Sequence, residues 1–204
     1  MSKRMWIPAM LTVAAALSAL AADPAPAPNP SPAAPAIGAA APEFKLADQD
    51  GKMVDLADYK GKVVVLEWIN KDCPIDRRVL NAKTMVNLYA KYKDKVAWFA
   101  IDSTAAHKPA DYETTIKEFD IKYPVLDDAK GTVGHLYHAE TTPHMFIINS
   151  DGKLVYMGGI DNDPMGTKAT KVNYVDQALT ELLAGKAITS PESKPYGCSV
   201  KYGD

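Results

Sequence analysis

The stretch of sequence that decides the fold is VVVLEWINKDCPIDRRV, which runs from Val63 to Val79. Its first six residues are apolar except for Glu67, and such a run is typical of a strand that is buried on both faces of a parallel sheet. Pro74 suits the first turn of a helix. The stretch therefore predicts a buried strand that leads through a short loop into a helix, with Cys73 at the junction.

The rest of the chain repeats this alternation of strands and helices. Residues 96–101 predict a second buried strand, and residues 111–119 predict a second amphipathic helix. Residues 145–148 and 154–156 flank an Asp-Gly pair that favours a hairpin turn, and residues 174–183 predict a closing helix. Near the start, residues 43–46 and 53–56 are expected to pair across another Asp-Gly turn. This order predicts a three-layer α/β domain with a mixed sheet.

The N-terminus has the pattern of an export signal. Lys3 and Arg4 precede an uncharged run from Met5 to Ala22, and Ala19-Leu20-Ala21 matches a small-x-small cleavage site. We therefore expect residues 1–21 to be a signal peptide and the protein to be periplasmic or extracellular, without stable membrane insertion after cleavage. The alternative is an anchor that is retained in the membrane.

The remaining chain is predicted to have three parts. Residues 22–42 hold seven prolines and nine alanines, a composition that cannot bury a core. We expect a disordered linker over 22–40, a folded domain over 41–185, and a tail over 186–204 that carries Cys198.

Composition excludes several classes of protein. The net charge is −2 over 204 residues, so the chain has no basic footprint for nucleic acid. The two cysteines, Cys73 and Cys198, are too few for a disulfide scaffold or a four-cysteine zinc site. No metal or organic cofactor is implied, and His107, His135 and His138 are expected at surface or loop positions.

Cys73 is the residue best placed for chemistry. A thiol between a strand and a helix that begins at Pro74 faces the positive end of the helix dipole and free backbone N–H groups. Both stabilise the thiolate, which is the nucleophilic form of cysteine. The alternative is a small buried hydrophobic residue, but the polar neighbours Lys71 and Asp72 favour a reactive thiol.

Cys198 lies 125 residues after Cys73, and three interpretations of it stay open. It is a resolving cysteine that forms a disulfide with oxidised Cys73, a static staple that ties the tail to the domain, or a free thiol. Cysteines usually pair in the oxidising compartment outside the cytoplasm. A mobile tail favours the resolving role, because the two sulfurs must separate during turnover.

Several motifs together resemble the thioredoxin superfamily, and within it the redoxin branch of peroxiredoxins and alkyl hydroperoxide reductase/thiol-specific antioxidant proteins. The motifs are Ala41–Leu46, Asp50–Lys52, Leu56–Val65, Asn70-x-x-Cys73-Pro74, Thr141-Thr142-Pro143 and Lys194–Tyr202. The resemblance covers about residues 41–185. It implies a thioredoxin-like three-layer α/β/α sandwich with a mixed central sheet.

The resemblance also implies a supporting shell around Cys73. Asn70 stands in the motif of the active cysteine, and Thr142-Pro143 matches the loop in which the family has a cis-proline facing that cysteine. Glu67 matches a buried carboxylate that accepts a proton in cysteine chemistry. Burial would raise the pKa of Glu67 toward neutrality, although a local hydrogen-bonding role at the strand end is equally compatible with its position.

The sequence departs from the family pattern at three points. Asp76 occupies the place of the second cysteine of thioredoxin, and Asn70 replaces the Thr or Ser of peroxiredoxins. The arginine that peroxiredoxins supply from a later strand is missing, and Arg77 and Arg78 are the arginines that remain after signal cleavage.

The leading hypothesis is an exported redoxin-type oxidoreductase that performs thiol–disulfide exchange or peroxide reduction. Cys73 attacks, Cys198 resolves, and a dithiol protein or small thiol donates electrons; Glu67, Asn70, Thr142 and Pro143 support the reaction. A second hypothesis is a non-enzymatic binding or redox-sensing module with a structural Cys73–Cys198 disulfide, which the three departures favour. A third is a copper carrier that uses the two cysteines and His144, although His144 is more simply a polar residue at a strand edge.

Overall fold

The computed structural model describes residues 34–203. The predicted signal peptide and most of the predicted linker lie outside this range. Within it, contacts begin before residue 41, because Gly38 N–H donates to Leu154 O at 2.7 Å and Ala40 forms a bridge with Lys153. No helix in the described part of the chain is long and apolar enough to traverse a lipid bilayer.

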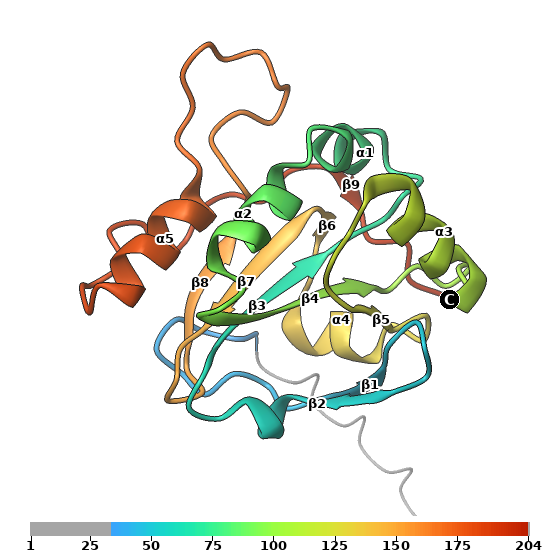
Figure 1. Ribbon diagram of the computed structural model, residues 1–204, viewed down its shortest axis with the longest axis horizontal. Coiled ribbons are helices and arrows are strands. Elements are labelled where there is room, and N and C mark those ends of the chain that lie inside the picture. The colour runs from blue at the N-terminus through green and yellow to red at the C-terminus, as the bar shows by residue number, and fades with distance from the viewer. Residues whose placement is uncertain (1–33, 204) are drawn as a thin grey trace, which may run out of the picture. The chain divides into compact units, whose positions relative to one another are not determined.

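A five-stranded mixed sheet forms the centre, in the order β5-β4-β3-β7-β8 (Figure 1). Strands β3, β4 and β5 run parallel to one another, whereas β7 is antiparallel to both β3 and β8. The bounds of these strands are β3 Val63–Trp68, β4 Val96–Asp102, β5 Val125–Asp127, β7 His144–Ile148 and β8 Leu154–Gly158.

The other elements surround this sheet. The helices are α1 Pro74–Asn81, α2 Thr84–Tyr92, α3 Pro109–Phe119, α4 Thr132–Tyr137 and α5 Tyr174–Leu183, and a 3-10 helix η1 spans Leu56–Tyr59. Two small sheets pair β1 Lys45–Ala47 with β2 Met53–Asp55, and β6 Thr141–Thr142 with β9 Cys198–Ser199.

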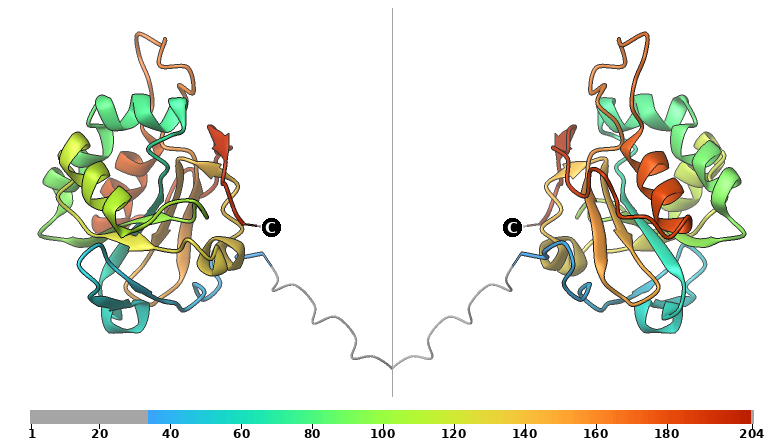
Figure 2. Two further views of the ribbon diagram at one scale, coloured as in Figure 1. Left: turned by 90° about the vertical axis from the view of Figure 1, so that its right-hand side faces the viewer. Right: turned by 90° about the vertical axis from the view of Figure 1, so that its left-hand side faces the viewer.

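Strand β3 explains the layers, because its side chains alternate between two cores. Val63 and Val65 belong to a core that also contains apolar residues of α1, α2, α3 and α5. Val64, Leu66 and Trp68 belong to a second core, which packs against α4, η1 and the β1–β2 hairpin. Figure 2 shows these helices on the two sides of the sheet. The predicted α/β/α sandwich with a mixed sheet is confirmed, and burial on both faces accounts for the unbroken apolar run.

The helical segment that starts at Pro74, where the sequence predicts a helix, consists of two helices, α1 and α2. Lys83 has φ +52°, which lies in the left-handed region, and it separates α1 from α2. The break reorients the chain, so that Val79 and Leu80 of α1 and Met85 and Leu88 of α2 all reach the same core.

Candidate functional site

Cys73 is the N-cap residue of α1 and is buried, with 3% of its surface exposed. The turn before it is built by Asn70, whose carbonyl accepts the Cys73 N–H at 3.0 Å and whose side-chain Oδ1 accepts the Asp72 N–H at 2.8 Å. Pro74 then starts the helix without losing a hydrogen bond, because the first turn has free N–H groups. The loop geometry thus follows from Asn70 and Pro74, and it places Cys73 at the carboxyl end of β3.

The cis-proline loop lies directly against the thiol. The Thr142–Pro143 peptide bond is cis, as the family resemblance implies. Cys73 Sγ donates to the Thr142 carbonyl oxygen over 3.2 Å. Thr142 is buried, and its Oγ1 has no hydrogen-bond partner among the described residues. The hydrogen bond from the Cys73 thiol therefore goes to the Thr142 backbone.

The C-terminal tail brings Cys198 to the same place. Strand β9 pairs with β6 so that Cys198 is opposite Thr142, and the Cys198 N–H donates to Cys73 Sγ over 3.3 Å. Both cysteines are free thiols in this structure. Gly197 makes the approach possible, because a Cβ on it would lie 2.0 Å from the Thr142 carbonyl oxygen. Cys198 and Cys73 therefore lie close together while both are free thiols.

The environment of the two thiols makes them unequal. Burial alone would raise the pKa of Cys73, but hydrogen bonds from the Cys198 thiol, the Asp76 N–H and the Cys198 N–H bring it below the ordinary value. Burial raises the pKa of Cys198, and its hydrogen bond to Cys73 raises it further. At neutral pH the thiolate therefore forms preferentially on Cys73, which is the sulfur expected from sequence.

The tail is fastened on both sides of Cys198, which differs from the mobile tail that we expected. Before it, Ser193 N–H donates to Met157 O at 3.1 Å, and the Tyr196 hydroxyl donates to Asp161. After it, the Tyr202 hydroxyl donates to Ala139 O at 2.7 Å and its ring stacks on His135. The segments before and after Cys198 are thus both held against the domain.

Glu67 is fully buried on β3, and its Oε2 accepts hydrogen bonds from Tyr123 Oη at 2.8 Å and Trp98 Nε1 at 3.2 Å. Its Oε1 has no partner among the described residues. Burial raises the pKa of Glu67 to about 7, against the lowering effect of these two bonds. A pKa near neutrality suits proton exchange, and the two hydrogen bonds equally fit the local structural role that the sequence also allows.

His107 lies in the loop between β4 and α3, which agrees with the predicted surface or loop position, but its side chain is buried rather than exposed. It is buried, with Nδ1 2.6 Å from Asp102 Oδ2 and Nε2 2.8 Å from Asp72 Oδ2. The bond to Asp102 is the main reason that its pKa rises to about 9, so the ring is charged at neutral pH. The link pins the loop before Cys73 to the end of β4.

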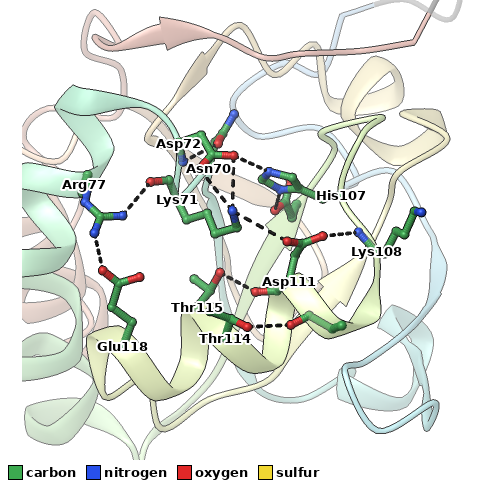
Figure 3. A network of polar contacts seen from close by, with 12 residues as sticks. Asn70, Lys71, Asp72, Arg77, His107, Lys108, Asp111, Thr114, Thr115 and Glu118 are labelled. Atoms are coloured by element: carbon green, nitrogen blue, oxygen red, sulfur yellow. Dashed lines mark hydrogen bonds and ion pairs between the residues drawn. The ribbon is translucent and has the colours of Figure 1, made fainter.

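Figure 3 shows how this network continues. Lys71 lies within ion-pair distance of Asp72 and Asp111, which joins the loop to the start of α3. The sequence signal that could have identified the network is a histidine five residues after an aspartate that ends a buried strand. The network was missed because the pairing depends on a turn that has no clear local pattern.

The two arginines beside Cys73 are engaged elsewhere. Arg77 forms an ion pair with Glu118 on α3 and bonds to Lys71 O at 3.4 Å (Figure 3). Arg78 donates to Pro164 O at 2.9 Å, and its Nε is buried without a partner among the described residues. No hydrogen bond or ion pair recorded for the described residues joins either guanidinium to the Cys73 sulfur.

His144 lies beside Glu140 and a separate cavity. Its Nδ1 accepts the Glu140 N–H at 3.2 Å, and the ring lines a cavity of about 210 Å³ together with Tyr137, Phe146 and Met157. Burial lowers its pKa to about 4, so the ring is neutral. Across residues 34–203, no three His, Cys, Asp or Glu side chains are grouped as a metal site, and the copper hypothesis has no ligand set there.

Comparison with known proteins places the chain among redox proteins. The profile of the AhpC/TSA family matches residues 37–157. The thiol-disulfide oxidoreductase ResA of Bacillus thuringiensis subsp. konkukian is 35% identical over 121 residues, which are 58% of this chain and 67% of that relative. The family match ends before Cys198, so the tail lies outside it.

Two solved structures share the fold. An uncharacterized conserved protein from Geobacillus kaustophilus is 29% identical with a TM-score of 0.73, covering 82% of this chain and 93% of its own. A protein assigned as thiol:disulfide interchange protein DsbE from Chlorobium tepidum is 28% identical with a TM-score of 0.55, and the match covers 61% of this chain and 85% of that protein. The chain therefore belongs to the AhpC/TSA redoxin family of the thioredoxin superfamily.

Proposed function

We propose that this protein is an exported thiol–disulfide oxidoreductase in which Cys73 attacks and Cys198 resolves. The observation that carries the proposal is the contact between the two cysteines beside the cis-proline loop, with the Cys198 N–H donating to Cys73 Sγ over 3.3 Å. The relatives named thiol-disulfide oxidoreductase ResA support the same reaction class.

The reaction has two exchanges. The Cys73 thiolate attacks one sulfur of a substrate disulfide; a bond forms between them, the substrate bond breaks, and the departing thiolate takes up a proton. Cys198 then loses its proton and attacks Cys73, which releases the second substrate thiol and leaves a Cys73–Cys198 disulfide. A donor dithiol, either a protein or a small thiol, returns the two electrons.

Supporting residues have different roles in this proposal. Asn70 and Pro143 shape the two loops that meet at the sulfur, and the Thr142 carbonyl accepts the Cys73 hydrogen bond in the thiol state. Glu67 is proposed as a proton acceptor within the domain, and its pKa of about 7 suits that role.

Disulfide exchange is preferred over peroxide reduction. An arginine that steadied the peroxide would have to approach Cys73, and both neighbouring arginines are committed to Glu118 and Pro164. A peroxide route would form a sulfenic acid on Cys73 and release water or an alcohol, and Cys198 would then condense with it and release a second water. This route remains the comparison in the experiment.

The test uses the purified full chain with a protein disulfide substrate and a dithiol reductant. We expect wild type to accelerate reduction, Cys73→Ser to give the background rate, and Cys198→Ser to accumulate a mixed disulfide on Cys73. Ser199→Ala is the matched control, because Ser199 is the exposed neighbour of Cys198 in β9. Equal rates for wild type and Cys73→Ser would refute the proposal, and peroxide consumption measured in parallel distinguishes the two routes.

Export is tested separately on the same chain. We expect the protein isolated from the exported fraction to begin at Ala22, because the small-x-small pattern ends at Ala21. A protein that keeps Met1 and sediments with membranes would instead indicate a retained anchor.

A further inference from the structure

Asp76 is a buried carboxyl group that the proposed mechanism does not use. It lies three residues after Cys73, in the first turn of α1, and none of its surface is exposed. Its Oδ2 accepts the Asn70 N–H at 2.6 Å, whereas Oδ1 is buried and has no partner among the described residues. A carboxylate in this position would be poorly compensated.

The neighbours of Asp76 add negative charge rather than remove it. Glu67 on β3, Cys73 at the start of α1 and Asp102 on β4 all disfavour an ionised Asp76. The negative charge of Asp102 is already balanced by the ion pair with His107, and Glu67 accepts hydrogen bonds from two neutral side chains. Asp76 has one backbone N–H, and no ion pair recorded within residues 34–203 reaches it.

Burial is the main reason that the pKa of Asp76 lies well above its ordinary value, and it acts in both redox states. The charge on Cys73 raises this pKa further in the reduced state alone, because a disulfide carries no charge, so formation of the disulfide lowers the pKa of Asp76. The influence is mutual, because a proton on Asp76 removes a negative charge beside the sulfur. Cys198 on β9 is the other titratable group beside Cys73, and its raised pKa keeps it a thiol when Cys73 is ionised.

We propose that Asp76 takes up one proton when the Cys73–Cys198 disulfide is reduced and releases it when the disulfide forms. Reduction places a negative charge on Cys73 and a proton on Cys198; the additional proton on Asp76 keeps the net charge of the buried site unchanged. Two electrons therefore enter with two protons, although one of the two thiols is ionised. This inference rests on the proposed Cys73–Cys198 exchange and names the group that balances its charge.

The proton count is measured from a redox equilibrium. The full chain is equilibrated with reduced and oxidised glutathione at several pH values below about 8, where ordinary thiols keep their protons. Two glutathione thiols release two protons when they form a disulfide. The equilibrium constant considered is that for reduction of the protein disulfide by glutathione. If the protein takes up two protons on reduction, this constant is independent of pH. If it takes up one proton, the constant rises tenfold per pH unit.

The decisive variant is Asp76→Asn, whose side-chain oxygen can still accept the Asn70 N–H. We expect the equilibrium constant for reduction to be independent of pH for wild type and to rise tenfold per pH unit for Asp76→Asn. Glu67→Gln is the control, and it should shift the profile without adding this slope. Identical slopes for wild type and Asp76→Asn overturn the inference, as does a slope that appears only in Glu67→Gln.

A second measurement uses wild type and does not depend on how well the variant folds. Infrared difference spectra between the oxidised and reduced forms should show a protonated-carboxyl band that grows on reduction, and its absence overturns the inference. Failure of the chain to form any Cys73–Cys198 disulfide would refute the proposed function itself. The two failures are therefore distinguishable.

Discussion

Gly197→Ala is the substitution that separates the tail from the thiol most directly. A Cβ at this position would lie 2.0 Å from the Thr142 carbonyl oxygen and 2.7 Å from its carbonyl carbon. Both are backbone atoms, so no side-chain rotation relieves the overlap. The residue also has φ +133°, where an L-amino acid is strained. Strand β9 must therefore move away from β6.

The movement removes the hydrogen bond from the Cys198 N–H to Cys73 Sγ. A hydrogen bond to a charged group contributes about 1.5–3 kcal/mol. Its loss disfavours the thiolate by that amount and therefore raises the pKa of Cys73. Because this bond favours the thiolate in the folded protein, the thiolate fraction at neutral pH falls.

The assay follows the ultraviolet absorbance of the thiolate against pH in a Cys198→Ser background, where Cys73 is the remaining cysteine. Gly185→Ala is the matched control, since Gly185 also has a positive φ of +69° but no atom within 4 Å of its added Cβ. Gly185→Ala should leave the titration unchanged. If Gly197→Ala leaves it unchanged too, the Cys198 amide does not hold the thiolate and the reasoning is refuted.

Three further predictions address the surroundings of the thiol. Glu67→Gln should raise the free energy of unfolding above pH 7 by up to about 3 kcal/mol, because the Glu67 carboxyl has a pKa of about 7 in the folded protein and about 4.5 in the unfolded chain. Urea titrations of wild type and variant at pH 5 and 8 check this, and an equal effect at both pH values would contradict it. His107→Gln should lower the free energy of unfolding by roughly 1–3 kcal/mol at neutral pH. Because the pKa of His107 rises from 6.5 to about 9 in the folded protein, this loss is full below pH 6.5 and disappears as the pH rises through about 9. Stability curves of wild type and variant that differ equally at all pH values would exclude the charged histidine. Tyr202→Ala should speed alkylation of Cys73 several-fold by loosening the tail, with Tyr202→Phe separating the hydroxyl bond to Ala139 from the ring stacking on His135; unchanged rates in both would show that this anchor does not control access.

The central part of the fold was predictable because its signals are local. The alternation of strand and helix, the unbroken apolar run of β3 and Pro74 after Cys73 each need only a short window of sequence. The division of the helix at Lys83 was not predictable, since a lysine with positive φ carries no sequence signal and arises from tertiary packing.

The tail was predicted to carry a reactive cysteine but not to be held in place. Its pairing with β6 joins Thr142 and Cys198, which are far apart in sequence, through a ladder of only two residues. The contacts of Tyr196 and Tyr202 join similarly distant partners. Hydrophobic periodicity does not register such isolated contacts, and a segment with Pro191 and Pro195 was therefore expected to be mobile.

Position and chemistry together explain why Cys73 can work with a distant partner. In a motif with two neighbouring cysteines, one turn of helix supplies both sulfurs; here that turn supplies Cys73 and Asp76, and the second sulfur arrives on β9. The exchange partner and the proton-holding group thereby lie on different elements. A change in the tail should alter access and pairing of the sulfurs, whereas a change at Asp76 should alter the number of protons that accompany the electrons. The two variants Gly197→Ala and Asp76→Asn are consequently expected to affect different measurements on the same thiol.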